Sequence, residues 1–314
     1  MGEQMVKETK IAIVNDVHIA ERNHPCRKDN FMETAVNKLD YIATNNDYVI
    51  LAGDLFHVAS NSLNVLYVMY TLMMKHRGKF IGIYGNHDIF NRNMSLNNKT
   101  TVGILKLVGA YDVKYREEFD VAGIKFYAVD VEQECDTIPI DTDNEKVLIG
   151  HKYYNQPDKT YESLSSEDIR RLNYNMVFLG HDHKPYDESF VGKSVIVRMG
   201  SLTRIDTQEY NKDRDIVYYQ LVTTGDGQFE YSAKVVPHKP TKECYTEEGY
   251  AKLLRHEEEK EYVSYIQIGD ALARLTKKST GSNSLDKVLK RIGTPQSSID
   301  EIKWRHELNN VTYT

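Results

Sequence analysis

The sequence is poor in cysteine, in long apolar runs and in positive charge, and each shortage argues against a class of protein. Its three cysteines, Cys26, Cys135 and Cys244, stand far apart without a Cys-x-x-Cys pair, which is atypical of a disulfide framework or a zinc knuckle. No stretch approaches the roughly 20 apolar residues of a membrane-spanning helix, and residues 1–10 lack the apolar core of a signal peptide. A formal net charge of -6 argues against a broad basic surface for nucleic acid. We therefore expect a reduced protein of the cytoplasm (the host cytoplasm if a phage encodes it), with no membrane partner.

What the sequence does contain is typical of a globular α/β protein. Its 314 residues, 40% hydrophobic and 27% charged, allow one large domain with a smaller attachment. Short apolar runs at 11–14, 48–52 and 80–84 alternate with amphipathic segments at 31–42 and 62–76. The first of these segments would be capped by Asp29 or Asn30. Such alternation predicts parallel strands joined by right-handed helical crossovers.

The rest of the chain predicts a second sheet and a C-terminal extension. Helices are expected at 103–108 and, capped by Ser165 or Ser166, up to Leu172, and residues 130–145 are expected to form a surface loop. Strands are expected at 125–129, 147–150, 176–179, 195–199 and 216–222, with antiparallel parts, so that two sheets pack together with helices outside. We place a boundary near Lys242, which gives a domain over 1–241 and an extension over 242–314. Helices are expected there at 250–261, 284–292 and 298–308, the last with Trp304.

Polar side chains cluster where five of the predicted strands end. They are Asp16 and His18, Asp54, Asn86 and His87, His151, and His181 and His183. Carboxylate and imidazole groups without a thiolate suit Mn²⁺, Fe²⁺ or Zn²⁺. Residues two apart in an extended segment project to the same side, so each Asp-x-His or His-x-His pair can hold one ion or two adjacent ions. A single carboxylate such as Asp54 can bridge two ions roughly 4 Å apart, the arrangement that activates a water molecule for phosphoester cleavage.

His87 differs from its neighbour Asn86 in that it can carry a proton. As a general acid for the departing oxygen, it would contribute a factor of about 10² to 10⁴ in rate. Imidazole binds a metal only when it is neutral, so activity should fall below roughly pH 6. We expect Asp88 to form a turn or to orient an imidazole.

These motifs resemble the five motifs of the calcineurin-like metallophosphoesterases. They are Asp16-Val17-His18, Gly53-Asp54, Gly85-Asn86-His87-Asp88, Gly150-His151 and Gly180-His181-Asp182-His183, spread over about residues 10 to 205. The resemblance implies a four-layer αββα sandwich. It also implies one metal held by Asp16, His18, Asp54 and His183, and a second held by Asp54, Asn86, His151 and His181.

Within that superfamily the chain is most similar to the SbcD-type DNA-repair nucleases, in the short form of large phages. Gly53-Asp54-Leu55-Phe56-His57 resembles their second motif, and Gly200-Ser201-Leu202-Thr203-Arg204 resembles a segment after their last motif. The resemblance implies catalytic roles for His57 and His87, two Mn²⁺ ions, DNA as substrate, an SMC-like coiled-coil ATPase partner and a homodimer. The dimer would use helices near the first motifs, with 31–42 and 63–74 as candidates.

Three positions in or beside these motifs leave questions open. Asn15 precedes the first aspartate, and Asp182 stands where the resembled motif commonly has an apolar residue, so it could add a buried carboxylate that alters metal preference. Arg204 could bind a phosphate of the substrate or pair with an acidic side chain.

Three functions follow from the sequence as hypotheses. The first is a manganese-dependent DNA exonuclease or endonuclease, the nuclease subunit of a nuclease–ATPase complex in repair or recombination. The second keeps the metals but acts on a small phosphodiester, a cyclic nucleotide or a phosphoprotein. The third is a scaffold without activity that binds a partner through residues 250–308. The intact ligand and acid positions disfavour the third.

Overall fold

The computed structural model of the chain describes residues 8–142, 146–159 and 162–254. The chain divides into two compact units, Met1–Gly249 and Tyr250–Thr314. The expected helices at 284–292 and 298–308, with Trp304, and most of the one at 250–261 lie outside the described residues. The structure below is that of the first unit, and the role of the 242–314 extension stays a prediction.

The first sheet has six strands in the order β14-β13-β1-β2-β3-β4. Its parallel part consists of β1 (Thr9–Val14), β2 (Tyr48–Leu51), β3 (Phe80–Ile83) and β4 (Asp112–Lys114). The antiparallel part consists of β13 (Val217–Thr223), which pairs with β1, and β14 (Phe229–Val235), which pairs with β13. The crossovers contain α1 (Phe31–Asn45), α2 (Leu63–Lys75) and α3 (Thr101–Leu107). The expected strand–helix alternation is confirmed.

The second sheet has the order β11-β12-β10-β7-β6-β5. Four strands are parallel neighbours, namely β6 (Ile124–Val129), β7 (Lys146–His151), β10 (Met176–Gly180) and β12 (Ser194–Val197). The edge strands β5 (Glu118–Val121) and β11 (Ser189–Val191) are antiparallel to their neighbours. The helix α4 (Ser166–Leu172) precedes β10, and β8 (Tyr153–Tyr154) pairs with β9 (Ser163–Leu164).

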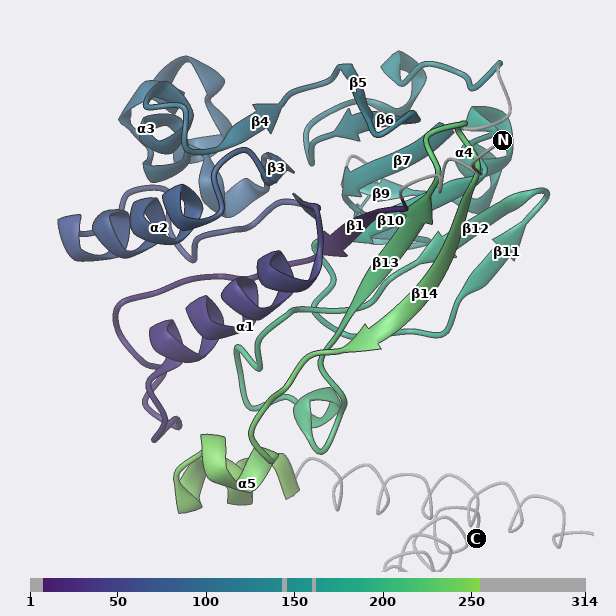
Figure 1. Cartoon of the computed structure of the whole chain (residues 1–314). Coiled ribbons are helices and arrows are strands. Elements are labelled where there is room, and N and C mark those ends of the chain that lie inside the picture. Colours follow the sequence, from purple (N-terminus) through teal and green to yellow (C-terminus); the bar gives the residue numbers. More distant parts are fainter. Residues whose placement is uncertain (1–7, 143–145, 160–161, 255–314) are drawn as a thin grey trace, which may run out of the picture. The chain divides into compact units, whose positions relative to one another are not determined.

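Side-chain alternation along the strands separates three hydrophobic cores and so four layers. In β1, Ile11 and Ile13 face the second sheet, whereas Ala12 and Val14 pack with residues of α1 and α2. In the second sheet, Phe178 of β10 joins the core between the sheets, while Leu179 packs with Leu172 of α4. Figure 1 shows α1 and α2 beside the first sheet and α4 beside the second. This is the expected αββα arrangement.

Helix caps and one loop refine the predictions. Asn30, rather than Asp29, caps α1 by accepting the backbone N–H of Glu33 at 3.1 Å, because Asp29 is bonded to Arg27. Ser165 caps α4 in a capping box with Asp168. The expectation of a surface loop at 130–145 is wrong for part of its described residues, since Val131, Ile138 and Asp141 are buried. None of the helices in the described ranges is long and apolar enough to cross a membrane.

Candidate metal centre

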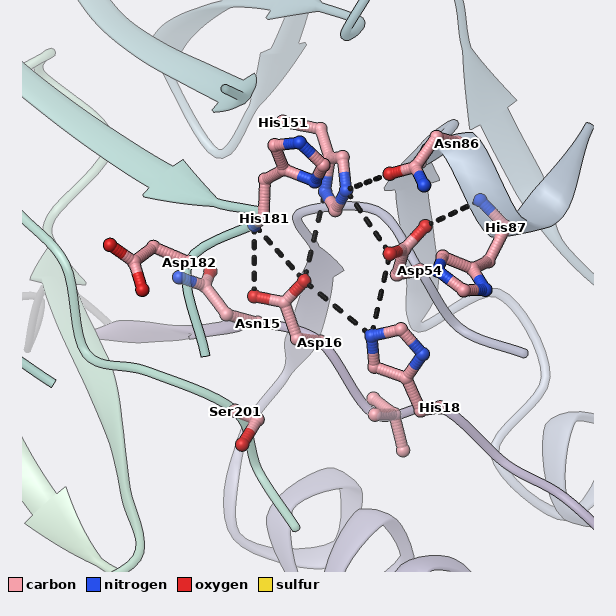
Figure 2. Close-up of polar contacts among 12 residues, drawn as sticks. Asn15, Asp16, His18, Asp54, Asn86, His87, His151, His181, Asp182 and Ser201 are labelled. Atoms are coloured by element: carbon pink, nitrogen blue, oxygen red, sulfur yellow. Dashed lines mark hydrogen bonds and ion pairs between the residues drawn. The ribbon is translucent and has the colours of Figure 1, made fainter. Parts of the chain in front are cut away.

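The polar side chains predicted from the strand ends converge at one edge of the two sheets. They follow or end β1, β2, β3, β7 and β10. Figure 2 shows the side chains of Asp16, His18, Asp54, Asn86, His151 and His181 pointing toward one another. Parallel strands place their carboxyl ends at the same edge, which explains the convergence. Asp16, His18, Asp54 and His181 have φ angles of 43°, 53°, 48° and 85°. The left-handed region is unfavourable for such residues, and strain of this kind clusters at functional sites.

Asp54 stands at the middle of the cluster. Its Oδ2 atom lies 3.4 Å from His18 Nε2 and 3.3 Å from His151 Nε2. Its Oδ1 atom accepts the backbone N–H of His87 at 2.9 Å, which fixes the carboxylate (Figure 2). Asp54 therefore presents one oxygen to two groups of ligand-type atoms at once.

The two groups agree with the two sets implied by the sequence motifs. One contains atoms of Asp16, His18, Asp54 and His183, and the other contains atoms of Asp54, His151 and His181, each within 4.8 Å of one another. Asn86 extends the second group, because its Oδ1 atom lies 3.1 Å from His151 Nε2.

Hydrogen bonds to the backbone orient two of the candidate ligands. His151 Nδ1 donates to the carbonyl oxygen of Ala52 at 2.9 Å, so that Nε2 faces Asp54. The Asp16 carboxylate accepts the backbone N–H of His181 at 3.0 and 3.1 Å. Both bonds cross from one sheet to the other, which ties the two halves of the cluster together.

Buried polar atoms in the cluster fit a bound cation. Both ring nitrogens of His18, Asp54 Oδ2 and Asn15 Oδ1 are buried, and none has a hydrogen-bond partner among the described residues. Leaving such groups unpaired is costly, so positive charge between them would offset the cost of burial. Carboxylate oxygens, an amide oxygen and imidazole nitrogens are ligands suited to Mn²⁺, Fe²⁺ or Zn²⁺.

The protonation of the cluster is also consistent with a cation site. Burial lowers the pKa of His18 and brings the pKa of His181 to about 3, so both imidazoles are neutral, as metal ligands must be. Burial raises the pKa of Asp16 to about 7. Burial also opposes the charge on Asp54, but attraction to His151 and His18 outweighs it and holds the Asp54 pKa below its usual range. His151 differs from His18 and His181 in its protonation. Burial opposes its charge, but attraction to Asp54 and Asp16 raises its pKa to about 9, so without a cation this ring is the positive partner of Asp54. Binding of a metal by His151 would therefore release its proton.

Two positions in the motifs require glycine, because their backbones lie too close to the side chains of His151 and Asp54 to leave room for a Cβ atom. A Cβ atom at Gly53, whose φ is +87°, would lie 2.4 Å from His151 Nδ1. A Cβ atom at Gly85 would lie 2.0 Å from Asp54 Oδ1. A larger residue at either position would displace a candidate ligand.

The two histidines predicted to be catalytic lie together beside the cluster. The rings of His57 and His87 are stacked with centroids 5.5 Å apart, and the His87 ring lies 4.9 Å from that of His18. His87 Nδ1 is hydrogen-bonded to the carbonyl oxygen of His57 at 2.7 Å. The side chain of His87 thus approaches the cluster from the side of β3, and His57 contacts it from the loop after β2.

Of the two roles expected for Asp88, a turn and an imidazole contact, the structure shows the turn, whereas Asp182 differs from its expectation. Asp88 is buried, and its carboxylate accepts the backbone N–H groups of Gly85 at 3.0 Å and Phe56 at 3.2 Å. It therefore joins the loops after β2 and β3 instead of orienting an imidazole. Asp182 is only partly buried, accepts the N–H of Lys184 at 3.2 Å and points away from Asp54 (Figure 2). It adds no buried carboxylate to the centre.

The structure contradicts the prediction that Arg204 binds a phosphate of the substrate. Its side chain is buried, and its guanidinium donates to the carbonyl oxygens of Asn211, Lys239 and Arg214 at 3.1, 3.1 and 2.9 Å. The N–H groups of Arg204 that would bind a phosphate thus already donate hydrogen bonds to backbone carbonyl oxygens. None of these three contacts is with an acidic side chain. Its role is to hold the loop after β12 against the segments at 211–214 and 239.

Three residues near the cluster were not predicted from the sequence. Glu162 Oε2 lies 3.4 Å from His181 Nε2, the ring of Tyr153 lies 4.1 Å from that of His181, and Arg92 donates to Glu162. Arg92 lies in a loop after β3, Tyr153 lies in β8, and Glu162 lies in the turn before β9. None of the three belongs to a sequence motif that would have predicted its place beside the cluster.

Comparisons with known proteins agree with the geometry. The profile of the calcineurin-like phosphoesterase superfamily domain matches residues 9–221. The DNA double-strand break repair protein Mre11 of Archaeoglobus fulgidus is 27% identical over 234 residues, which are 65% of this chain and 52% of the relative. The chain thus spans about half the length of this curated relative.

Two solved structures resemble the chain more distantly. A 5'-nucleotidase precursor of Thermus thermophilus has a TM-score of 0.43 at 13% identity, covering 80% of this chain and 59% of that one. The NAD nucleotidase of Haemophilus influenzae has a TM-score of 0.41 at 14% identity, covering 73% and 50%. The motifs, the fold and the profile agree, and the chain belongs to the calcineurin-like phosphoesterase superfamily.

Proposed function

We propose that the chain is a manganese-dependent DNA nuclease that hydrolyses phosphodiester bonds. The observation that supports this most is the His57–His87 pair beside Asp54, in a chain 27% identical to a DNA double-strand break repair protein over 234 residues. A proton donor beside a candidate metal cluster suits a substrate whose leaving group is a poor one, such as the alkoxide of a nucleotide sugar.

In this proposal each predicted residue has one role. Asp16, His18, Asp54 and His183 hold one divalent ion, and Asp54, Asn86, His151 and His181 hold the other. When bound, the two ions neutralise the phosphate and lower the pKa of a water molecule enough to supply the nucleophile near neutral pH.

The protein's own groups then orient the substrate and move the proton. His87, fixed through Nδ1 by the carbonyl of His57, presents Nε2 for donation to the departing oxygen. His57 lines the same cleft as His87 and stacks on it, which holds the donor ring toward the cluster. Asp88 fixes the loops that carry both histidines.

A homodimer and an ATPase partner belong to the same proposal. On α2, Leu63, Tyr67 and Tyr70 are 83%, 68% and 39% exposed and stand on one helical face. An exposed apolar stripe of this kind is a candidate protein interface. Light scattering of the wild type and of Tyr67→Glu tests it, since a dimer made by this face becomes a monomer in the variant. An SMC-like coiled-coil ATPase is proposed to bind the 242–314 extension.

The function is tested by incubating the protein with linear double-stranded and single-stranded DNA and Mn²⁺. The wild type should cleave DNA, and His87→Asn should cleave it at least about 100-fold more slowly with its metal content unchanged. Hydrolysis of bis(p-nitrophenyl) phosphate, a cyclic nucleotide or a phosphopeptide without DNA cleavage would favour the alternative substrates instead. Absence of bound metal in elemental analysis would favour a scaffold.

A further inference from the structure

A cleft of about 450 Å³ opens beside the candidate metal centre. His57, Asn86, His87 and Arg92 line it, together with residues of the loops after β2 and β3. Arg92 is the one residue in this lining that carries a permanent positive charge. The cleft is therefore the surface along which a substrate chain would reach His87, and Arg92 is the cation it would meet.

Arg92 is held by two carboxylates, one from the loop after β6 and one from the turn before β9. Its Nη1 atom lies 2.8 Å from Glu132 Oε1, and its Nη2 atom donates to Glu162 Oε1. Glu162 in turn contacts His181, with 3.4 Å between Oε2 and Nε2. The Arg92 guanidinium is thus connected through Glu162 to His181, a proposed metal ligand.

Of the two ion pairs, the one with Glu132 is exposed enough to be exchanged for a phosphate, whereas the Glu162 side chain is only 18% exposed. The side chain of Arg92 is 49% exposed, and that of Glu132 is 35% exposed. Exposed pairs contribute little to stability. The fork of a guanidinium binds carboxylate and phosphate in the same two-point geometry, so a phosphate oxygen pair can take the place of a carboxylate.

The backbone at Arg92 lies in the left-handed region. Asn91 and Arg92 have φ angles of 46° and 60°, two consecutive left-handed residues without a glycine. Asparagine tolerates this conformation, but arginine rarely adopts it. Strain of this kind is maintained where it places a side chain for function.

We propose that Arg92 binds a phosphate of the substrate chain next to the one that is hydrolysed, and so selects polynucleotides over small phosphodiesters. This rests on the proposed nuclease function and names its substrate-recognition residue. When the polynucleotide enters the cleft, the guanidinium leaves Glu132 and pairs with the flanking phosphate. A small diester has no flanking phosphate and gains nothing from Arg92.

The test compares a single-stranded oligonucleotide with bis(p-nitrophenyl) phosphate in three variants. Arg92→Gln should raise KM for the oligonucleotide about 10-fold, as loss of one charged hydrogen-bonding contact does, and leave kcat/KM for the small diester within about 2-fold. It should also reduce the slope of log affinity against log salt by about 0.7, the value for one phosphate contact on a single strand. Glu132→Gln should lower KM for the oligonucleotide, because Arg92 then has one competing carboxylate fewer.

Arg170→Gln is the matched control, since Arg170 is 59% exposed and pairs with one carboxylate, Glu167, at 2.8 Å on α4. It should change neither KM nor the salt slope. Equal losses on both substrates in Arg92→Gln, or a raised KM in both Arg92→Gln and Glu132→Gln, would overturn the inference and identify a structural ion pair. DNA cleavage with an unchanged KM in Arg92→Gln would overturn it while leaving the nuclease function intact. A wild type that hydrolyses the small diester but neither binds nor cleaves DNA would refute both.

Discussion

The Nδ1 atom of His87 is hydrogen-bonded to the backbone carbonyl oxygen of His57 at 2.7 Å. A carbonyl oxygen only accepts, so Nδ1 carries the proton, and Nε2 is left for the proton transfer to the substrate that is proposed for His87. The contact joins the loop after β2 to the loop after β3, the two loops whose residues line the cleft. The proposed proton donor is therefore positioned by main chain, and its ring can be replaced without moving the Asp54 contact to the His87 backbone.

The role of His87 is tested by changing the leaving group. His87→Asn should slow DNA cleavage by about 10² to 10⁴, because the departing alkoxide then lacks a proton donor. With bis(p-nitrophenyl) phosphate the loss should be less than about 10-fold, since p-nitrophenolate leaves without protonation. Steady-state rates of both substrates check this, with bound metal measured in the same samples. Equal losses on both substrates would show that His87 acts on something other than the leaving group.

Alanine substitutions at Gly85 and Gly78 test whether the close approach of Gly85 to Asp54 is needed for metal binding, with Gly78 as the control. Gly85→Ala should lose metal and activity, since its Cβ would lie 2.0 Å from Asp54 Oδ1. Gly78 has a φ of +80°, but no atom lies within 4 Å of the position that a Cβ would take. Gly78→Ala should therefore lower the free energy of unfolding by about 1 kcal/mol and retain both metal and activity. Elemental analysis and urea unfolding distinguish the two. Full metal occupancy in Gly85→Ala would contradict the described approach of the two loops.

Arg204 should affect stability and not substrate binding. Arg204→Gln removes a buried guanidinium that donates to three backbone carbonyls, so the free energy of unfolding should fall by about 3 kcal/mol. KM for DNA should stay within about 2-fold for the folded enzyme. Urea unfolding and kinetics in the same buffer test this, with Arg170→Gln as an exposed control that should change stability by less than about 0.5 kcal/mol. A raised KM without loss of stability would restore Arg204 as a substrate ligand.

Lys38 should make the stability of the protein depend on pH in the alkaline range. Burial, together with repulsion from Arg204 and Arg214, lowers the pKa of Lys38 to about 7, against 10.5 for the ordinary side chain. Between these values the unfolded chain keeps the proton that the folded protein has lost, so the free energy of unfolding rises with pH, by up to about 1.4 kcal/mol per pH unit from this group. Below pH 7 both states are protonated and the slope from Lys38 vanishes.

Lys38→Met isolates this contribution. The variant leaves the carbonyl of Leu202, which Lys38 contacts at 2.9 Å, without its donor, but that cost does not change with pH. Urea unfolding at pH 7, 8 and 9 should therefore show a flatter dependence on pH in the variant than in the wild type. Parallel curves would show that Lys38 keeps its proton in the folded protein.

Much of the fold and of the candidate centre could be predicted from the sequence, because both depend on short-range patterns. Buried parallel strands appear as continuous apolar runs, and the residues just after neighbouring strands of one sheet meet at one edge, so the order of residues places Asp54 near Asp16 and Asn86. That His151 joins them depends on how the second sheet packs on the first. The four edge strands of the two six-stranded sheets, β4, β5, β11 and β14, were not predicted, because three of them are only three or four residues long and β14 is mostly exposed.

The contacts that long-range packing creates could not be predicted. Arg204 and Arg92 are both arginines in loops beyond strand ends, and nothing in their local sequence shows that one is buried under residues 211–239 while the other faces a cleft. The Arg92–Glu162 contact joins residues 70 positions apart. A pattern of residue types does not show which backbone carbonyl will accept a hydrogen bond, so the contact of His151 with the carbonyl of Ala52 could not be predicted.

The measurement that tests the central claim most directly is anomalous diffraction at the manganese edge from a crystal soaked in Mn²⁺. Two peaks about 3.5–4 Å apart are expected, both within bonding distance of the Asp54 carboxylate, one beside His18 and His183 and the other beside His151 and His181. A single peak, or peaks away from Asp54, would contradict it.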